Sequence, residues 1–146
     1  VKMADLYGQA LQVARTLSVS TPKDGVVLYS ISFLPTRENK EQAFAYLEQH
    51  PEAMMIDQTD CGRELIKMGL EQTPPDLTPE QIAAVWKIAS ARMIAEARGD
   101  VKAFVKNADP RSVFRSTELP EILRNDQIKT INGVDKFFFA ESYFSE

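Results

Sequence analysis

The sequence has 146 residues, 44% hydrophobic and 26% charged, which suits one domain with a sizeable core and is short for two. Its 17 basic and 21 acidic side chains give a net charge of −4, which argues against nucleic acid as the main partner. The single cysteine, Cys61, permits no internal disulfide, and the sequence contains neither a membrane-span-length apolar run nor a signal peptide pattern.

The first half of the chain alternates helical and extended patterns. Apolar residues recur at helical spacing over residues 3–17 and predict an amphipathic helix, which turn-forming residues 18–25 terminate. Residues 26–30 form a short apolar run rich in β-formers and predict a buried central strand. A helix is expected over residues 39–49, then a second strand-like run at 53–56 and a short helix over 61–68.

The second half opens on the best-defined boundary in the sequence. Thr78 can cap a helix, Pro79 suits its first position, and Gln81 can complete a capping box, so a helix is predicted from here to near Gly99. Strands are expected at 101–105, 113–115 and 129–131, with a short helix over 119–123. The alternation predicts an α/β fold in which an N-terminal helix and further helices pack on a small, mostly parallel sheet.

We expect one domain, in which residues 1–25 form the N-terminal helix and linker and residues 26–146 form the α/β core. Because the sequence begins with Val1 rather than Met, we also expect it to be a segment of a longer protein.

Several common kinds of site do not fit the sequence. No glycine follows the first predicted strand, so neither a dinucleotide-binding fingerprint nor a phosphate-binding P-loop is present. The only histidine, His50, stands beside Pro51 at a helix end, which favours a solvated residue over a partner for a nucleophile. Cys61 with one histidine cannot form a usual zinc site, so no metal is expected.

Polar and aromatic residues instead gather where the predicted strands end, the usual position of ligands in open parallel sheets. They are Tyr29, Ser30, Asp57, Thr59, Arg115, Thr117 and Glu118. Trp86 and Ser90 lie four residues apart on one helix face, so a cleft that reaches one should reach the other. A structural interpretation stays open for each: Trp86 as a core residue, Glu118 as a solvated one and Asp57 as a turn cap.

In order and context these residues resemble the ADP-ribosyl cyclase family. Residues 27–30 are similar to that family's strand ending in an aromatic and Ser, and residues 57–62 to its acidic pair, Thr and Gly. Residues 86–92, with the strand after them, resemble its Trp and Ser helix, and Ser116-Thr117-Glu118 stand where the family has its catalytic glutamate. The resemblance covers residues 26–133.

The resemblance implies cleavage of NAD to nicotinamide and ADP-ribose, with NAD as substrate and neither cofactor nor metal. Glu118 would be the catalytic carboxylate that holds the ribose hydroxyls and stabilises a cationic ribosyl centre. Trp86 and Tyr29 would stack on nicotinamide, and Asp57 would contact its carboxamide. Ser90 and Ser30 would bind the phosphates or the intermediate, and three flanking residues, Thr59, Arg115 and Thr117, are included as substrate contacts.

Three departures from the family affect these expectations. The animal enzymes are rich in disulfides, whereas this chain has one cysteine. Tyr29 stands in place of a Trp, and Asp57 in place of a Glu that influences the balance of cyclisation and hydrolysis, so net hydrolysis is favoured. Glu121, one helical turn beyond Glu118, is the competing carboxylate.

The small size and lack of disulfides also resemble the C-terminal toxin modules of bacterial secretion systems. Such a module would be secreted or delivered into a target cell, would deplete NAD in the cytoplasm, and would have an immunity protein that plugs the cleft. Two alternatives stay open: an ADP-ribosyltransferase that modifies a macromolecule, and a module that binds a nucleotide or protein without turnover.

Overall fold

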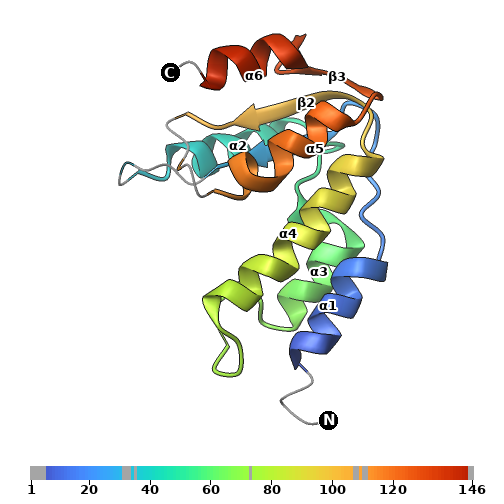
Figure 1. Ribbon diagram of the computed structural model, residues 1–146, viewed down its shortest axis with the longest axis vertical. Coiled ribbons are helices and arrows are strands. Elements are labelled where there is room, and N and C mark those ends of the chain that lie inside the picture. The colour runs from blue at the N-terminus through green and yellow to red at the C-terminus, as the bar shows by residue number, and fades with distance from the viewer. Residues whose placement is uncertain are drawn as a thin grey trace.

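The computed structural model describes residues 6–30, 34, 36–72, 74–106, 109 and 112–144 (Figure 1). The helices are α1 (Leu6–Thr16), α2 (Glu38–Gln49), α3 (Asp60–Lys67), α4 (Pro79–Glu96), α5 (Leu119–Arg124) and α6 (Lys136–Phe144). The strands are β1 (Val26–Tyr29), β2 (Gly99–Phe104), β3 (Ile128–Ile131) and β4 (Val134–Asp135). Two short turns complete the fold, the 3-10 turn η2 (Ile56–Gln58) and the π-helical turn η3 (Phe114–Glu118).

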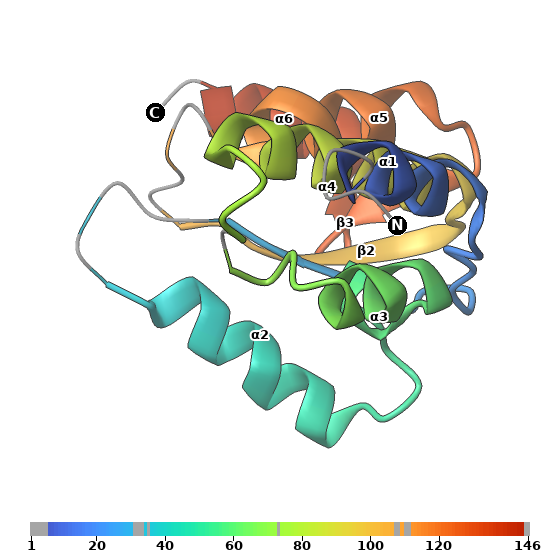
Figure 2. The same ribbon diagram turned by 90° about the horizontal axis from the view of Figure 1, so that it is seen from below.

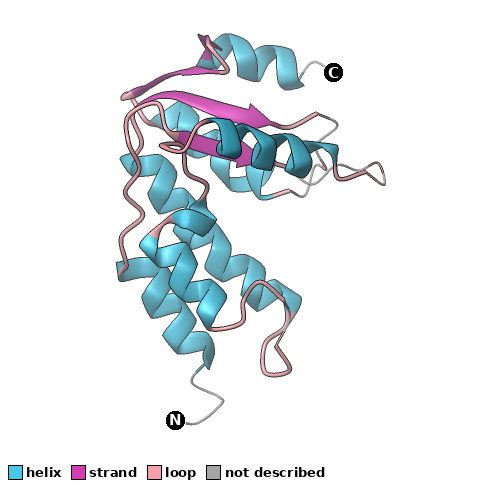
Figure 3. Ribbon diagram, turned by 180° about the vertical axis from the view of Figure 1, so that it is seen from behind, coloured by secondary structure: helices cyan, strands magenta, loops and turns pink. Residues whose placement is uncertain are grey.

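The four strands form one sheet in the order β1-β2-β3-β4. β1 pairs with β2 and β2 with β3 in parallel, and only the two-residue β4 is antiparallel, to β3. Figure 3 shows the strands, in magenta, gathered in the upper part of the view. The expected α/β architecture, with helices packed on a small, mostly parallel sheet, is therefore confirmed.

Helices cover both faces of the sheet. α2 packs against β1 and β2 on one face, and Figure 2 shows it on the opposite side of the sheet from α4, α5 and α6. α1 packs against α3 and α4, and the three helices lie together below the sheet in Figure 1. Within the described ranges, no helix combines the length and the apolar character needed to cross a bilayer.

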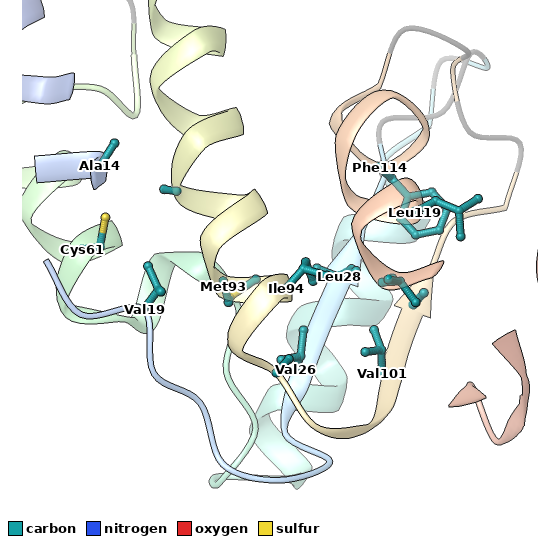
Figure 4. Packing of buried hydrophobic residues seen from close by; sticks show 14 of the residues in the cluster. Ala14, Val19, Val26, Leu28, Cys61, Met93, Ile94, Val101, Phe114 and Leu119 are labelled. Carbon is teal, nitrogen blue, oxygen red and sulfur yellow. The ribbon is translucent and has the colours of Figure 1, made fainter. Parts of the chain in front are cut away.

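The main core fills the space between the sheet, α4 and the α1–α3 pair. Val26 and Leu28 of β1 and Val101 of β2 pack with Met93 and Ile94 of α4 (Figure 4). A smaller core lies between α2 and the other face of β1. Because alternate residues of β1 enter the two cores, this strand is buried on both faces and separates the main core from the smaller one.

Local sequence signals set several boundaries as expected. The Thr78 hydroxyl accepts from the Gln81 N–H at 3.1 Å and the Gln81 side chain accepts from the Thr78 N–H at 2.9 Å, so the predicted capping box forms. The predicted helix over 3–17 is observed at Leu6–Thr16, and residues 3–5 lie outside the described residues. Cys61 is buried, as a structural cysteine should be, and its thiol contacts the Val13 carbonyl oxygen.

Two predicted strands are wrong. The run at 53–56 contributes only an isolated bridge from Met54 to Val26, because the chain turns at once into η2. The run at 113–115 is helical and leads into η3. The aromatic run 137–139 lies in α6, and Phe137 and Phe138 are 59% and 62% exposed.

Candidate active site

A cavity of about 460 Å³ opens where β1 ends, which is within the usual size range of small-molecule sites. Tyr29 and Ser30 enter it from the end of β1, and Asp57 from η2. Trp86 and Ser90 enter from α4, and Glu118 from η3. The remaining wall residues are Val27, Leu28, Lys40, Phe44, Met55, Ile56, Leu70, Glu71, Ile82, Ser112, Val113 and Phe114.

Glu118 is the most buried carboxyl group of this wall. Glu118 is only 6% exposed. Its carboxyl group accepts a hydrogen bond from the hydroxyl of Ser90, which is 3% exposed. Burial raises the pKa of Glu118 from 4.5 to about 7, although the bond from Ser90 opposes the shift by favouring the ionised form. A carboxyl group with a pKa near neutrality inside a cavity is typical of functional sites.

A local distortion of the helix brings Glu118 to the cavity. The N–H of Leu119 donates to the carbonyl of Phe114, five residues back, and this bond defines the π-helical turn. Pro120 follows and has no N–H, so the α-helical bond to the Ser116 carbonyl cannot form and the turn widens. Phe114, which is 1% exposed, anchors the turn in the core, so the position of Glu118 is fixed by packing.

The aromatic walls are held by separate contacts. The Trp86 indole N–H donates to the Leu70 carbonyl oxygen at 3.0 Å, so the segment after α3 orients the ring. Tyr29 lies with its ring centroid 6.5 Å from that of Phe44. Burial raises the pKa of Tyr29, and the carboxyl groups of Asp57 and Glu118 raise it further, so its phenol is a neutral hydrogen-bonding group at pH 7.

Asp57 is the second partly buried acid of the cavity. Burial raises its pKa, the negative charge of Glu71 adds to this effect, and the ammonium group of Lys40 opposes it. Among the described residues of the wall, the charged side chains are thus three acids, Asp57, Glu71 and Glu118, and one base, Lys40. This excess of acid favours a ligand whose innermost part is cationic.

Three residues expected at the site lie outside the cavity wall. The hydroxyl of Thr59 accepts from the Gly62 N–H at 3.1 Å and donates to the Ile56 carbonyl at 2.6 Å, so it caps α3. Arg115 lies over the Tyr143 ring, 5.4 Å from its centroid, and the Thr117 hydroxyl contacts that of Ser116. The competing Glu121 pairs with Arg124 and is also absent from the wall.

The sequence arguments did not single out Lys40, Phe44, Glu71 or Ser112 as wall residues. Phe44 falls within the helix predicted over residues 39–49, and its i, i+4 relation to Lys40 could have suggested that both share one surface. Glu71 lies between helices, where spacing carries no signal. Among the described residues, no three His, Cys, Asp or Glu side chains gather closely enough to hold a metal ion.

The fold is that of the ADP-ribosyl cyclases. The chain superposes on the Aplysia cyclase complexed with substrate NGD and product cGDPR with a TM-score of 0.53 and 19% identity, over 75% of this chain and 48% of that one. An ADP-ribosyl cyclase complexed with N1-cIDPR gives a TM-score of 0.53, 16% identity and the same two coverages. An ADP-ribosyl cyclase with one glutamate replaced by alanine gives a TM-score of 0.54 and 12% identity, over 89% and 74%.

The chain therefore spans about half the length of the first two cyclases, and at these identities the likeness concerns the fold alone. No protein-family model and no curated protein sequence matches it. Any assignment of activity must therefore start from the residues of the cavity.

Proposed function

We propose that this chain hydrolyses NAD to nicotinamide and ADP-ribose. The observation that carries the proposal is the buried carboxyl group of Glu118, hydrogen-bonded to Ser90 in a cavity whose walls include Trp86 and Tyr29. The likeness in fold to cyclases, one of them complexed with the substrate NGD, supports the same class of chemistry.

The chemistry needs a negative charge near the sugar and little else. The bond between ribose C1′ and the pyridinium nitrogen breaks, and its electron pair leaves with nicotinamide, which becomes neutral. Positive charge then develops on C1′ and the ring oxygen, and an ionised Glu118 in a partly dry cavity stabilises it. Water adds to C1′, its proton is lost to solvent, and the products are ADP-ribose and nicotinamide.

The remaining wall residues have positioning roles in this proposal. Trp86 and Tyr29 hold the planar nicotinamide ring between aromatic surfaces, which restricts the substrate before bond cleavage. Asp57 binds the carboxamide, and its raised pKa lets it do so as a hydrogen-bond donor when protonated. Ser90 and Ser30 supply hydroxyl groups close to the ribose and its phosphate.

The direct test is incubation of the purified chain and its Glu118→Gln variant with NAD, with products separated by chromatography. We expect nicotinamide and ADP-ribose in equal amounts from the wild type and a loss of at least 100-fold in the variant. Cyclic ADP-ribose as the main product would show that the chain is a cyclase rather than a hydrolase. Transfer of label from NAD to protein or RNA would favour a transferase. Binding of NAD by the folded protein without nicotinamide release would refute the proposal.

The toxin role and an immunity partner stay predictions. Their test is induced expression in bacteria with and without the Glu118→Gln substitution. We expect the wild type alone to lower cellular NAD and stop growth, and normal growth at equal protein levels would refute the toxin role.

A further inference from the structure

The cavity has an outer wall on α2 that the proposed chemistry at Glu118 does not use. Lys40 and Phe44 lie one helical turn apart and both line the cavity. The Lys40 ammonium stands 5.9 Å from the centroid of the Phe44 ring, so a cation and an aromatic face form one surface. Lys40 is exposed and Phe44 is 39% exposed, and the centroid of the Phe44 ring lies 6.5 Å from that of Tyr29.

The same two residues also border a second hollow on the outer side of α2. This hollow has a volume of about 360 Å³ and is lined by Arg37, Lys40, Glu41, Phe44, Ala45 and Glu48. Lys40 and Phe44 belong to both walls, so a ligand longer than the cavity would meet these two side chains at its outer end.

Charge and burial change together along this path. The inner end holds Glu118, 6% exposed, and Ser90, 3% exposed, whereas the outer end holds the exposed cations Lys40 and Arg37 beside the exposed acids Glu41 and Glu48. The lining thus changes from acidic at the inner end to one with exposed cations at the outer end. A dinucleotide with a pyridinium ring carries its positive charge at one end and a doubly negative pyrophosphate, followed by a purine, beyond it. Lys40 is the only cationic side chain among the described residues of the cavity wall.

α2 is fixed at its first turn, so this outer wall has a defined position. The buried side chain of Asn39 donates to the carbonyl oxygens of Ser30 at 3.0 Å and Lys106 at 2.8 Å, and accepts from the Lys106 N–H at 3.2 Å. These bonds join α2 to the segments that leave β1 and β2. The neighbouring Lys40, which lines the cavity, is therefore carried by a helical turn that these bonds hold in place.

We propose that Lys40 and Phe44 form an outer subsite for the adenylate half of a dinucleotide, with Lys40 on the phosphates and Phe44 under the purine. The inference rests on the proposed function for the identity of the dinucleotide. An ammonium group can bind phosphate through charge-assisted hydrogen bonds, and an exposed aromatic ring can stack on a purine. Their role is to add affinity for the whole dinucleotide without touching the bond that breaks.

Kinetics with shortened substrates test the subsite. Nicotinamide riboside lacks phosphate, and nicotinamide mononucleotide keeps one phosphate but lacks the adenylate half. In Lys40→Gln we expect the ratio of kcat/KM for NAD to that for nicotinamide riboside to fall about tenfold, mostly through KM. In Phe44→Leu the ratio for NAD to that for nicotinamide mononucleotide should fall several-fold. Lys129→Gln and Phe138→Leu remove an exposed cation and an exposed ring elsewhere and are the matched controls.

Calorimetric titration with ADP tests the same subsite without turnover. We expect wild type and Lys129→Gln to bind ADP alike and Lys40→Gln to bind it about tenfold more weakly. If ADP binding depends on Lys40 but the protein releases no nicotinamide from NAD, the subsite proposal stands and the proposed hydrolysis is refuted. Absence of ADP binding by the wild type, or unchanged ADP affinity and substrate ratios in Lys40→Gln, would overturn the subsite while leaving NAD cleavage standing.

Discussion

The hydroxyl of Ser90 donates a hydrogen bond to the carboxyl group of Glu118, and both residues are almost fully buried. The two belong to different elements, α4 and the π-helical turn η3, so the bond joins the long helix to the turn that carries the proposed catalytic carboxylate. It also favours the ionised carboxylate against the burial that disfavours it. This balance makes the pair sensitive to pH and to substitution.

The first prediction concerns stability. The pKa of Glu118 is raised in the folded state from 4.5 to about 7. The stability that the protonated Glu118 gives the folded state is therefore fully present below pH 4.5 and is lost as the pH rises through 7. Glu118→Gln cannot ionise and should escape this loss. Relative to wild type, we expect the variant to gain roughly 2–3 kcal/mol in unfolding free energy between pH 5 and pH 8. Urea unfolding at both pH values measures this gain, with Glu121→Gln as the control. A difference in unfolding free energy between Glu118→Gln and wild type that does not change with pH would contradict the prediction.

The second prediction concerns activity. If ionised Glu118 is the active form, kcat/KM for NAD should rise with pH and level off above about 7, since this parameter reports the free enzyme. Ser90→Ala removes a bond that lowers the pKa, so its profile should shift to higher pH by roughly one unit. Initial rates of nicotinamide release from pH 5.5 to 9 test this. Ser116→Ala, which removes an exposed hydroxyl from the same turn, should keep the wild-type midpoint.

The third prediction separates a structural role from substrate binding at Thr59. Thr59→Val keeps the shape of the side chain but removes its bonds to Gly62 and Ile56. Loss of this helix cap should reduce the unfolding free energy by about 1–2 kcal/mol. We expect KM for NAD to stay within twofold of wild type at a temperature where the variant is folded. A large increase in KM with unchanged stability would instead make Thr59 a substrate contact.

The fourth prediction concerns the attachment of α2. Asn39→Ala leaves the buried carbonyl of Ser30 and both backbone groups of Lys106 without this partner, which should cost about 2–4 kcal/mol. Thermal unfolding against Gln42→Ala, an exposed position three residues on, gives the comparison. Equal melting temperatures for the two variants would show that the clamp contributes little.

The elements that the sequence predicted well depend on local signals. Thr78, Pro79 and Gln81 act within one helical turn, so the start of α4 could be inferred without knowledge of the tertiary structure. The helical spacing of Trp86 and Ser90 likewise put both on one face, and both line the cavity. For such features the sequence contains the whole physical cause.

The features that could not be predicted from the sequence are those determined by contacts between residues far apart in the chain. Residues 113–115 have strand-like composition, but Phe114 is buried in the main core within a turn that Pro120 widens. The residue pattern around Thr59 did not indicate the helix cap that its hydroxyl forms with the Gly62 N–H, and its expected contact with substrate stays a prediction. Lys40 is an ordinary surface residue in sequence, and it becomes part of the cavity wall through the fixed position of α2.

The fastening of α1 also bears on the order in which the protein folds. Arg92 of α4 donates to the carbonyl oxygens of Ala14 and Leu17 at the end of α1, across sequence separations of 78 and 75 residues. An 11-residue helix is marginal in water by itself, so α1 depends on its packing partners α3 and α4, of which α4 is synthesised later. During synthesis at about 5–20 residues per second, α1 would wait roughly 4–16 s for α4 to be made. The helical layer beneath the sheet is thus expected to be completed late on the ribosome, with the part of α1 that α4 covers exposed to chaperones until then.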